Sequence, residues 1–193
     1  MIPEKPKAVL TLAHGAGAGM NHSWMVEIAT ALAETAAIAT LRFNFPFTEH
    51  KKGRPDQPAV AHATIAAAMD HARAELPKVP LFGAGKSFGG RMTSQYLAAN
   101  PRSDVHGVVF FGFPLHPAGK PSVERAAHLK EVKVRMLFLQ GTKDELAIWE
   151  LIEPVCAALP LATLVKIEGA NHAFKAGKRD VIVELVQATS AWL

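Results

Sequence analysis

Gly83-Ala84-Gly85-Lys86-Ser87-Phe88-Gly89-Gly90 lies between the apolar run Val79–Phe82 and the helix-like segment Arg91–Leu97. The order is strand, Gly-x-Ser-x-Gly and helix, which is the setting of a nucleophile elbow. In such a turn the central serine takes a strained backbone with positive φ, and flanking glycines let neighbouring backbone approach without a Cβ clash. The pattern predicts that Ser87 stands exposed beyond a strand, with the N–H of Phe88 beside it as a donor to an oxyanion.

Two other interpretations fit the same glycines. Gly85-Lys86-Ser87 resembles the end of a phosphate-binding P-loop, but that motif needs a glycine five residues earlier, where Pro80 stands. Only Gly83 and Ala84 would separate the expected strand from Gly85, and two residues make too short a loop to wrap a phosphate. A purely structural glycine-rich turn is the other alternative to the elbow.

Short apolar, β-rich runs alternate along the chain with longer helical patterns. Strands are expected near residues 8–14, 38–44, 79–83, 105–112, 134–140 and 163–167, and helices near 23–35, 59–76, 88–99, 145–159 and 179–192. Val108–Phe111 is almost continuously apolar and should be buried on both faces. The alternation predicts an α/β fold, a single domain over residues 1–193 with a mostly parallel sheet of about six strands and helices on both faces.

Length and composition limit the classes of protein that fit. A chain of 193 residues can bury a substantial core, and its one cysteine, Cys156, excludes an internal disulfide and suits a reducing compartment. The net charge of +4 is mild and the basic residues are scattered, which does not support nucleic-acid binding. The first apolar stretch, residues 8–13, is too short for a signal peptide or a membrane span. We expect a cytoplasmic protein with no membrane partner; the oligomeric state is not predicted.

A serine hydroxyl needs a base, and the base needs a group that fixes its tautomer. After an elbow these follow along the chain as Asp or Glu and then His. Asp144 comes just past the expected strand 134–140, at its carboxyl end. It could instead be the N-cap of the next helix, a common role for Asp. Glu145 is the fallback acid, although it is expected in the first helical turn.

The candidate base is His172, one of nine histidines. It alone lies on a loop after the last expected strand and before the last helix, whereas His62, His71 and His128 fall in helical patterns and His106 begins a strand. A coincidental histidine is the alternative. No compact cluster of His, Cys and Asp with metal-ligand spacing remains, so we expect no metal and no cofactor.

The first expected strand ends in a second glycine-rich turn, His14-Gly15-Ala16-Gly17-Ala18-Gly19. Such a turn can present a second backbone N–H to an oxyanion. Dinucleotide binding through Gly-x-Gly-x-x-Gly is the rival interpretation, but the third glycine position holds Met20 or His22. We expect His14 to structure the turn rather than to take part in chemistry.

Four features now agree: the glycine-rich turn after the first strand, the serine elbow, Asp144 after a later strand, and His172 before the last helix. With them the chain resembles the α/β-hydrolase superfamily over nearly its whole length. Leu41–Pro46 and Gly85–Met92 are more narrowly similar to a small family of predicted hydrolases. That family includes the non-specific-lethal complex subunit 3 domain and a testis-expressed protein, and it is similar to dienelactone hydrolases. The resemblance implies Ser87 as nucleophile, Asp144 as orienting acid, His172 as base, and the N–H groups of Phe88 and Ala16 as the oxyanion hole. Almost nothing precedes the first strand, so the usual first two strands are expected to be absent.

The expected pocket is shallow and open. About twenty residues separate Gly112 from Val134, too few for the helical cap that many related enzymes insert there. Apolar walls are expected at Phe45, Phe47, Phe113 and Leu115, with core packing as the alternative for each. The resemblance and the residue order together imply a serine hydrolase that forms an acyl-enzyme on a small ester or thioester. The alternative is a non-catalytic interaction domain that keeps the fold.

Overall fold

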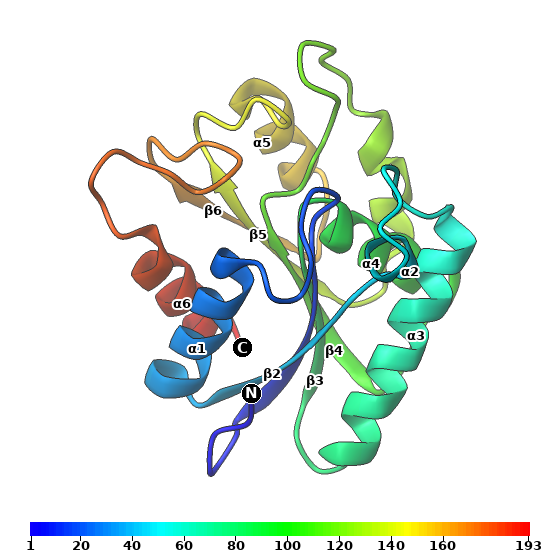
Figure 1. The fold of residues 1–193 in the computed structure, drawn as a ribbon. Helices are drawn as coiled ribbons and strands as arrows, with labels where there is room; N and C mark the ends of the chain where they lie inside the picture. Colours follow the sequence, from blue (N-terminus) through cyan, green and yellow to red (C-terminus); the bar gives the residue numbers. More distant parts are fainter.

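A computed structural model describes the protein over its whole length, Met1–Leu193. Its centre is one sheet of six strands in the order β2-β1-β3-β4-β5-β6 (Figure 1). The strands are β1 Ala8–Ala13, β2 Ile38–Phe43, β3 Leu81–Lys86, β4 Val105–Phe111, β5 Arg135–Gly141 and β6 Ala162–Ile167. Every neighbouring pair is parallel. The structure confirms the predicted single-domain α/β fold with about six parallel strands.

The helices lie in two layers, one on each face of the sheet (Figure 1). One layer holds α1 Ser23–Ala36 and α6 Val181–Trp192, and the other holds α3 Pro58–Glu75, α4 Phe88–Ala99, α5 Trp149–Ala157 and the 3₁₀ helix η1 Glu124–Glu131. Alternate side chains of a strand point to opposite faces. In β4, Val108 and Phe110 therefore pack into the second layer, while Val109 and Phe111 pack into the first. The predicted burial of this strand on both faces is confirmed.

Strand β3 runs three residues further than the sequence predicted. Gly83 and Gly85 continue the ladder with both β1 and β4 because β3 is a central strand. Helix α4 crosses β3 so closely that a Cβ on Gly85 would lie 2.3 Å from the backbone nitrogen of Gly90. The glycines therefore serve helix–strand contact, and no loop precedes Ser87 in which a phosphate could be wrapped.

Two other segments differ from expectation. The helix expected near 145–159 begins only at Trp149, because the Asp144 carboxylate and carbonyl accept the N–H groups of Leu146 and Ala147 in a turn. The N-cap of α5 is Ile148, so Asp144 does not cap it. The segment 45–58, where apolar pocket walls were expected at Phe45 and Phe47, contains the short helix α2, Pro46–Glu49, and turns both phenylalanines inward.

The connection from β4 to β5 carries only the eight residues of η1 as regular structure. This agrees with the prediction that the connection is too short for a helical cap. None of the helices combines the length and the hydropathy that crossing a bilayer requires.

Candidate active site

Ser87 occupies the turn between β3 and α4 with φ 51° and ψ −118°. This positive φ is strained for a residue with a side chain, and the structure around it holds it in place. Gly89 allows this, because a Cβ there would lie 2.5 Å from the carbonyl oxygen of Ala13 on the neighbouring strand. Ser87 is the N-cap residue of α4, yet its side chain makes no cap hydrogen bond. Its hydroxyl is therefore available to another partner.

That partner is His172, on the loop between β6 and α6. The ring atom Nε2 of His172 lies 2.8 Å from Ser87 Oγ, and Nδ1 lies 2.8 Å from Asp144 Oδ2. With its proton on Nδ1, the ring donates to the carboxylate and accepts from the serine hydroxyl. The structure brings together the three residues that the sequence analysis selected, each just past the end of a strand.

Asp144 is 2% exposed, and three donors fix its carboxylate. Oδ2 accepts from His172 and from the amide of Gln140 at 2.6 Å, and Oδ1 accepts from the N–H of Leu146 at 2.8 Å. Glu145 is exposed and makes no such contacts. The structure therefore favours Asp144 over Glu145 as the acid that faces the histidine.

Gln140 is a residue that sequence reasoning missed. It is fully buried at the end of β5, where its amide nitrogen donates to Asp144 and its Oε1 accepts from the N–H of Phe113 at 2.9 Å. It thus joins the carboxylate to the start of the β4–β5 connection. A polar side chain closing the apolar run Met136–Leu139 was the available signal.

Lys86, the residue before the serine, was also missed. Its ammonium group donates to the backbone carbonyl of His172 and lies 4.5 Å from the centre of the Phe174 ring. The residue as a whole is half-buried. Burial lowers the pKa of Lys86 to about 8, and the charges of Asp144 and Glu145 act in the opposite direction. Nothing in its sequence position indicated this.

The turn after β1 lies directly against the elbow. A Cβ on Gly15 would lie 3.6 Å from Ser87 Cβ. The N–H of Ala16 has no backbone partner within the chain, and the N–H of Phe88 belongs to the first turn of α4, where N–H groups lack intrahelical acceptors. Both N–H groups are therefore available near the serine, as an oxyanion site requires.

His14 holds this turn in place, in line with its expected structural role. It is fully buried, its Nδ1 lies 2.8 Å from the carbonyl oxygen of Gly15, and its Nε2 accepts from the N–H of Phe45 at 3.1 Å. Burial lowers the pKa of His14, which favours the neutral ring. The ring is used at both nitrogens and points away from Ser87.

A cavity of about 440 Å³ opens beside the Ser87–His172 pair. Its other walls come from residues 15–18 of the glycine-rich turn, Trp24 and Met25 of α1, and Leu146 of the β5–α5 loop. A larger hollow of about 560 Å³ near Thr35 and Ser190 has no histidine in its lining, so volume alone does not locate the site. No group of three or more His, Cys, Asp or Glu side chains could hold a metal ion.

The expected pocket walls are wrong. Phe45, Phe47, Phe113 and Leu115 are 0%, 3%, 0% and 0% exposed and belong to the core on the α3/α4 face. The Phe45 ring stacks on Phe47 at 5.9 Å and meets Phe88 edge-on at 5.4 Å. The segment after β2 folds inward and buries these rings, which pack against Phe88 at the elbow. The cavity opens instead toward α1.

The comparison with known proteins identifies the class. Residues 6–190 match the family model of an alpha/beta hydrolase domain, so the chain belongs to the α/β-hydrolase family. Its more specific likeness to the non-specific-lethal complex subunit 3 group stays a prediction.

Solved structures with this fold include hydrolases. A serine hydrolase homologue from Coxiella burnetii superposes with a TM-score of 0.80 at 22% identity, over 100% of this chain and 89% of that chain. Dienelactone hydrolase from Anabaena variabilis superposes with a TM-score of 0.80 at 22% identity, over 99% of this chain and 87% of that chain. A serine hydrolase without lid from Xanthomonas campestris superposes with a TM-score of 0.74 at 24% identity, over 100% of this chain and 87% of that chain. At these identities the likeness shows the fold.

Two curated relatives from Mycobacterium tuberculosis carry the name "Putative phosphoribosyl transferase". Each is 29% identical over 185 residues, which cover 90% of this chain. The match spans 38% of the length of those relatives. Their name therefore refers to proteins much longer than the part that this chain resembles.

Proposed function

We propose that the protein is a serine hydrolase that cleaves small carboxylic esters or thioesters through an acyl-enzyme on Ser87. The observation that carries the proposal is the continuous hydrogen-bonded chain from Ser87 through His172 to Asp144, with both contacts at 2.8 Å. Membership of the α/β-hydrolase family supports it. A fold kept only as a scaffold has no need of a strained serine, an aligned base and a buried acid.

In the proposed acylation step, Ser87 Oγ attacks the carbonyl carbon while its proton passes to His172 Nε2. Asp144 holds the ring in the tautomer with the proton on Nδ1 and stabilises the imidazolium that forms. The negative charge on the former carbonyl oxygen is received by the N–H groups of Phe88 and Ala16. His172 then gives its proton to the leaving oxygen or sulfur, and the acyl group stays on Ser87.

In the deacylation step, water loses a proton to His172 Nε2 and attacks the acyl carbon. The second tetrahedral intermediate expels Ser87 Oγ, which takes the proton back from His172. The acid product leaves and the resting state is restored. No electron transfer or bound cofactor is needed for this sequence of steps.

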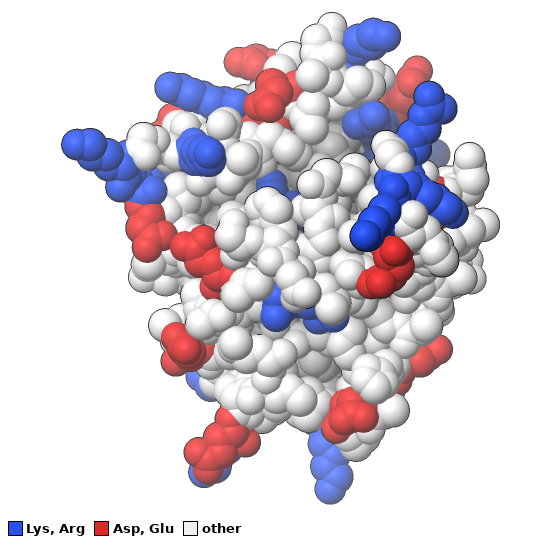
Figure 2. Space-filling view, viewed as in Figure 1, with Lys and Arg blue, Asp and Glu red and all other residues white.

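The cavity supports a small, largely uncharged substrate. Beyond the serine–histidine pair and Lys86, its walls come from residues 15–18 of the glycine-rich turn, His22, Trp24, Met25, Leu146 and Ala173. Lys86 is the one charged side chain among the lining residues, and its ammonium group already binds the His172 carbonyl. Figure 2 shows Lys and Arg interspersed with Asp and Glu over this face rather than gathered at one place.

Phosphoribosyl transfer is not proposed for this chain. The match to the relatives that carry that name covers only 38% of their length. In addition, strand β3 continues up to Lys86, so no loop before Ser87 is available to wrap a phosphate. A non-catalytic interaction domain is the competing possibility, and the following experiment decides between it and the enzyme.

The test is covalent labelling with a fluorophosphonate probe, which reacts with an activated serine. The wild-type protein should be labelled and Ser87→Ala should not, with the same circular dichroism spectrum. The matched control is Ser94→Ala, which removes another serine that touches a histidine, His128, outside the cavity. It should label like the wild type. Equal labelling of Ser87→Ala, or no labelling of the wild-type protein, would overturn the proposal.

A further inference from the structure

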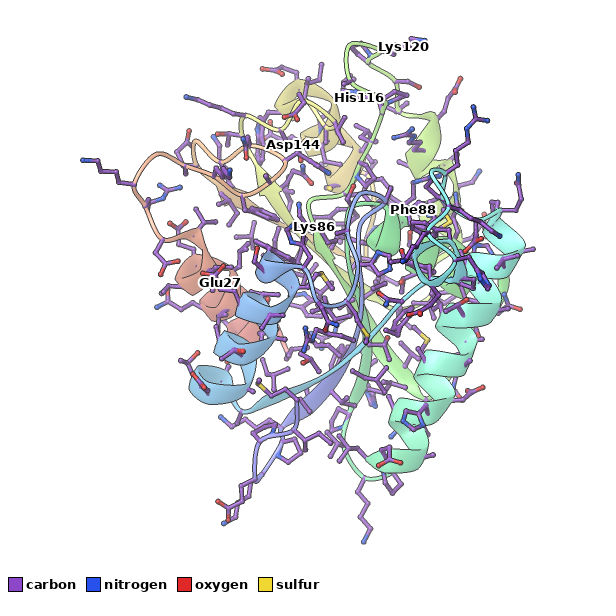
Figure 3. The ribbon with its side chains drawn as sticks, in the orientation of Figure 1. Glu27, Lys86, Phe88, His116, Lys120 and Asp144 are labelled. Carbon is purple, nitrogen blue, oxygen red and sulfur yellow. The ribbon has the colours of Figure 1, made fainter.

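Lys86 lies where the elbow meets the histidine loop. Its ammonium group donates to the carbonyl oxygen of His172, 86 residues away in the sequence, and lies over the rings of Phe174 at 4.5 Å and Trp24 at 5.4 Å. Figure 3 shows Lys86 close to the carboxyl end of the sheet, below Asp144. A buried cation at this place is costly unless it has a role or strong partners.

The ammonium group lies on the acid side of the histidine. A Cβ on Gly112, just past β4, would lie 3.4 Å from Lys86 Nζ, 3.6 Å from Asp144 Oδ2 and 3.6 Å from His172 Nδ1. The three groups thus surround one point. Nδ1 is the ring atom that faces away from Ser87, so the cation lies behind the base and not beside the serine hydroxyl.

We propose that Lys86 is a positioning residue for the base of the proposed hydrolase: its ammonium group fixes the His172 loop against the elbow, and its charge opposes proton transfer to the imidazole ring. This inference rests on the proposed function. It concerns how the base is held and charged, and it adds a residue that the serine–histidine–acid set does not contain.

The first role of Lys86 is mechanical. Residues 168–180 between β6 and α6 form neither helix nor strand, so the position of His172 depends on individual hydrogen bonds. The ring is held at both nitrogens, and Lys86 provides the donor for its backbone carbonyl. Removing that donor leaves a partly buried carbonyl unpaired, which costs free energy and favours displacement of the loop.

The second role of Lys86 is electrostatic. A positive charge near an imidazole opposes its protonation, because two like charges would then face each other. At a separation of about 6 Å and an effective dielectric constant of about 20, the effect is about two pH units. The ionisable groups that face Lys86 are Asp144, Glu145 and His172. α1 contributes the uncharged Trp24 and the histidine loop the uncharged Phe174. With a pKa of about 8, Lys86 carries its charge throughout the acidic range.

The test measures the rate of fluorophosphonate labelling of Ser87 against pH, which requires no knowledge of the natural substrate. In Lys86→Met, which keeps the length and removes the charge, the midpoint of the acidic limb should rise by about two pH units. The plateau rate should fall about tenfold because the loop is less well held. Lys86→Arg keeps the charge, so its midpoint should stay within a few tenths of the wild-type value. Lys143→Met, an exposed lysine one residue before Asp144, should match the wild type.

A Lys86→Met midpoint equal to that of the wild type would overturn the inference, even with a slower plateau, because packing alone would explain the slower rate. If that variant does not fold, Lys86→Gln takes its place. Absence of labelling in the wild type would instead sink the proposed function.

Discussion

Two serine side chains in this molecule contact a histidine ring. Ser87 Oγ lies 2.8 Å from Nε2 of His172, and Ser94 Oγ lies 2.7 Å from Nε2 of His128. The two serines are close together in the sequence, one at the start of α4 and the other within it. By distance alone, the second pair is as good a candidate for a nucleophile and its base as the first.

The surroundings of the two pairs differ in three ways. Ser87 has positive φ at a strand–helix turn, whereas Ser94 sits within a helix, where its hydroxyl can also donate to the carbonyl of Arg91 at 3.0 Å. Ser87 opens to a cavity, whereas Ser94 is fully buried. Behind His172 lies the carboxylate of Asp144, whereas Arg91 is the charge that acts most strongly on His128.

This third difference decides the chemistry. A base must accept a proton during the reaction, and a carboxylate behind the ring stabilises the resulting imidazolium. Burial and the charge of Arg91 lower the pKa of His128 to about 4, and no carboxylate is hydrogen-bonded to this ring to offset them. At His172 the carboxylate of Asp144, 2.8 Å from the ring, offsets the charge of Lys86. A short serine–histidine contact therefore does not by itself identify an active site. The histidine must also have a carboxylate at its other ring nitrogen.

The largest expected effects separate the two pairs by kinetics. Ser87→Ala and His172→Ala should each lower ester turnover by about 10⁴ to 10⁶-fold, and the double variant should be little worse, because the residues act as a unit. Ser94→Ala should stay within about twofold of the wild type, since its hydroxyl contacts no reacting group. Steady-state hydrolysis of para-nitrophenyl acetate measures all four proteins. A loss of 10⁴ in Ser94→Ala with the fold intact would reverse the assignment.

The next effect concerns the acid that distinguishes the pairs. Asp144→Asn should lower turnover by about 10⁴-fold, because an amide holds the histidine ring in the wrong tautomer. Glu145→Gln, the matched control one residue away, should have little effect because that side chain is exposed and has no contact with His172. The same assay compares them. Reversed effects would make Glu145 the acid and contradict the observed turn.

The parts of the site that could be predicted from the sequence are those tied to strand ends. In a parallel sheet the carboxyl ends meet at one edge, so a residue placed just past a strand is placed in space as well. Ser87, Asp144 and His172 were found in this way, and so was the glycine-rich turn. The central strand was predicted too short because glycines that serve helix contact look like a loop.

The parts that could not be predicted depend on where a side chain turns. Phe45 and Phe47 follow a strand end just as Asp144 does, yet an apolar segment at that edge can either line a pocket or fold inward. Here it folds inward, and Trp24 of α1 forms a wall instead. Gln140 and Lys86 lie at strand ends as well. The polarity of Gln140 was a local signal, but its contact with Phe113 and the contact of Lys86 with His172 join segments far apart in the sequence, which a local pattern does not predict.

A smaller effect is expected in the stability of the protein at acidic pH, through the second pair. The pKa of His128 is lowered in the folded state, so the unfolded chain binds this proton more readily. The contribution to stability is present above about pH 6.5 and is lost as pH falls toward 4. Allowing for partial exposure, the loss is about 1–2 kcal/mol. Its size is set by burial and by the charges of Arg91 and His62.

Urea denaturation at pH 7 and pH 4.5 measures this loss against His128→Gln, which keeps a polar partner for Ser94 and cannot be protonated. The free energy of unfolding of the wild type should fall by more than that of the variant. Other histidines with lowered pKa, such as His14, contribute equally to both proteins and cancel in the difference. Equal losses would mean that His128 is protonated as easily in the folded state as in the unfolded chain.

The smallest effect tests the cavity that only the first pair possesses. Each methylene buried against Trp24, Met25 or Leu146 contributes about 0.8 kcal/mol to transition-state binding, which is about a fourfold gain in kcat/KM. The short connection from β4 to β5 provides no cap to enclose a long chain. Over para-nitrophenyl esters from acetate to palmitate, kcat/KM should rise over the first few carbons and then level off. Trp24→Ala should flatten the initial rise, whereas Trp149→Ala, on α5 and outside the cavity, should preserve it. A rise that continues to palmitate would show that another segment closes over the acyl chain, and the open-cavity interpretation would then be wrong.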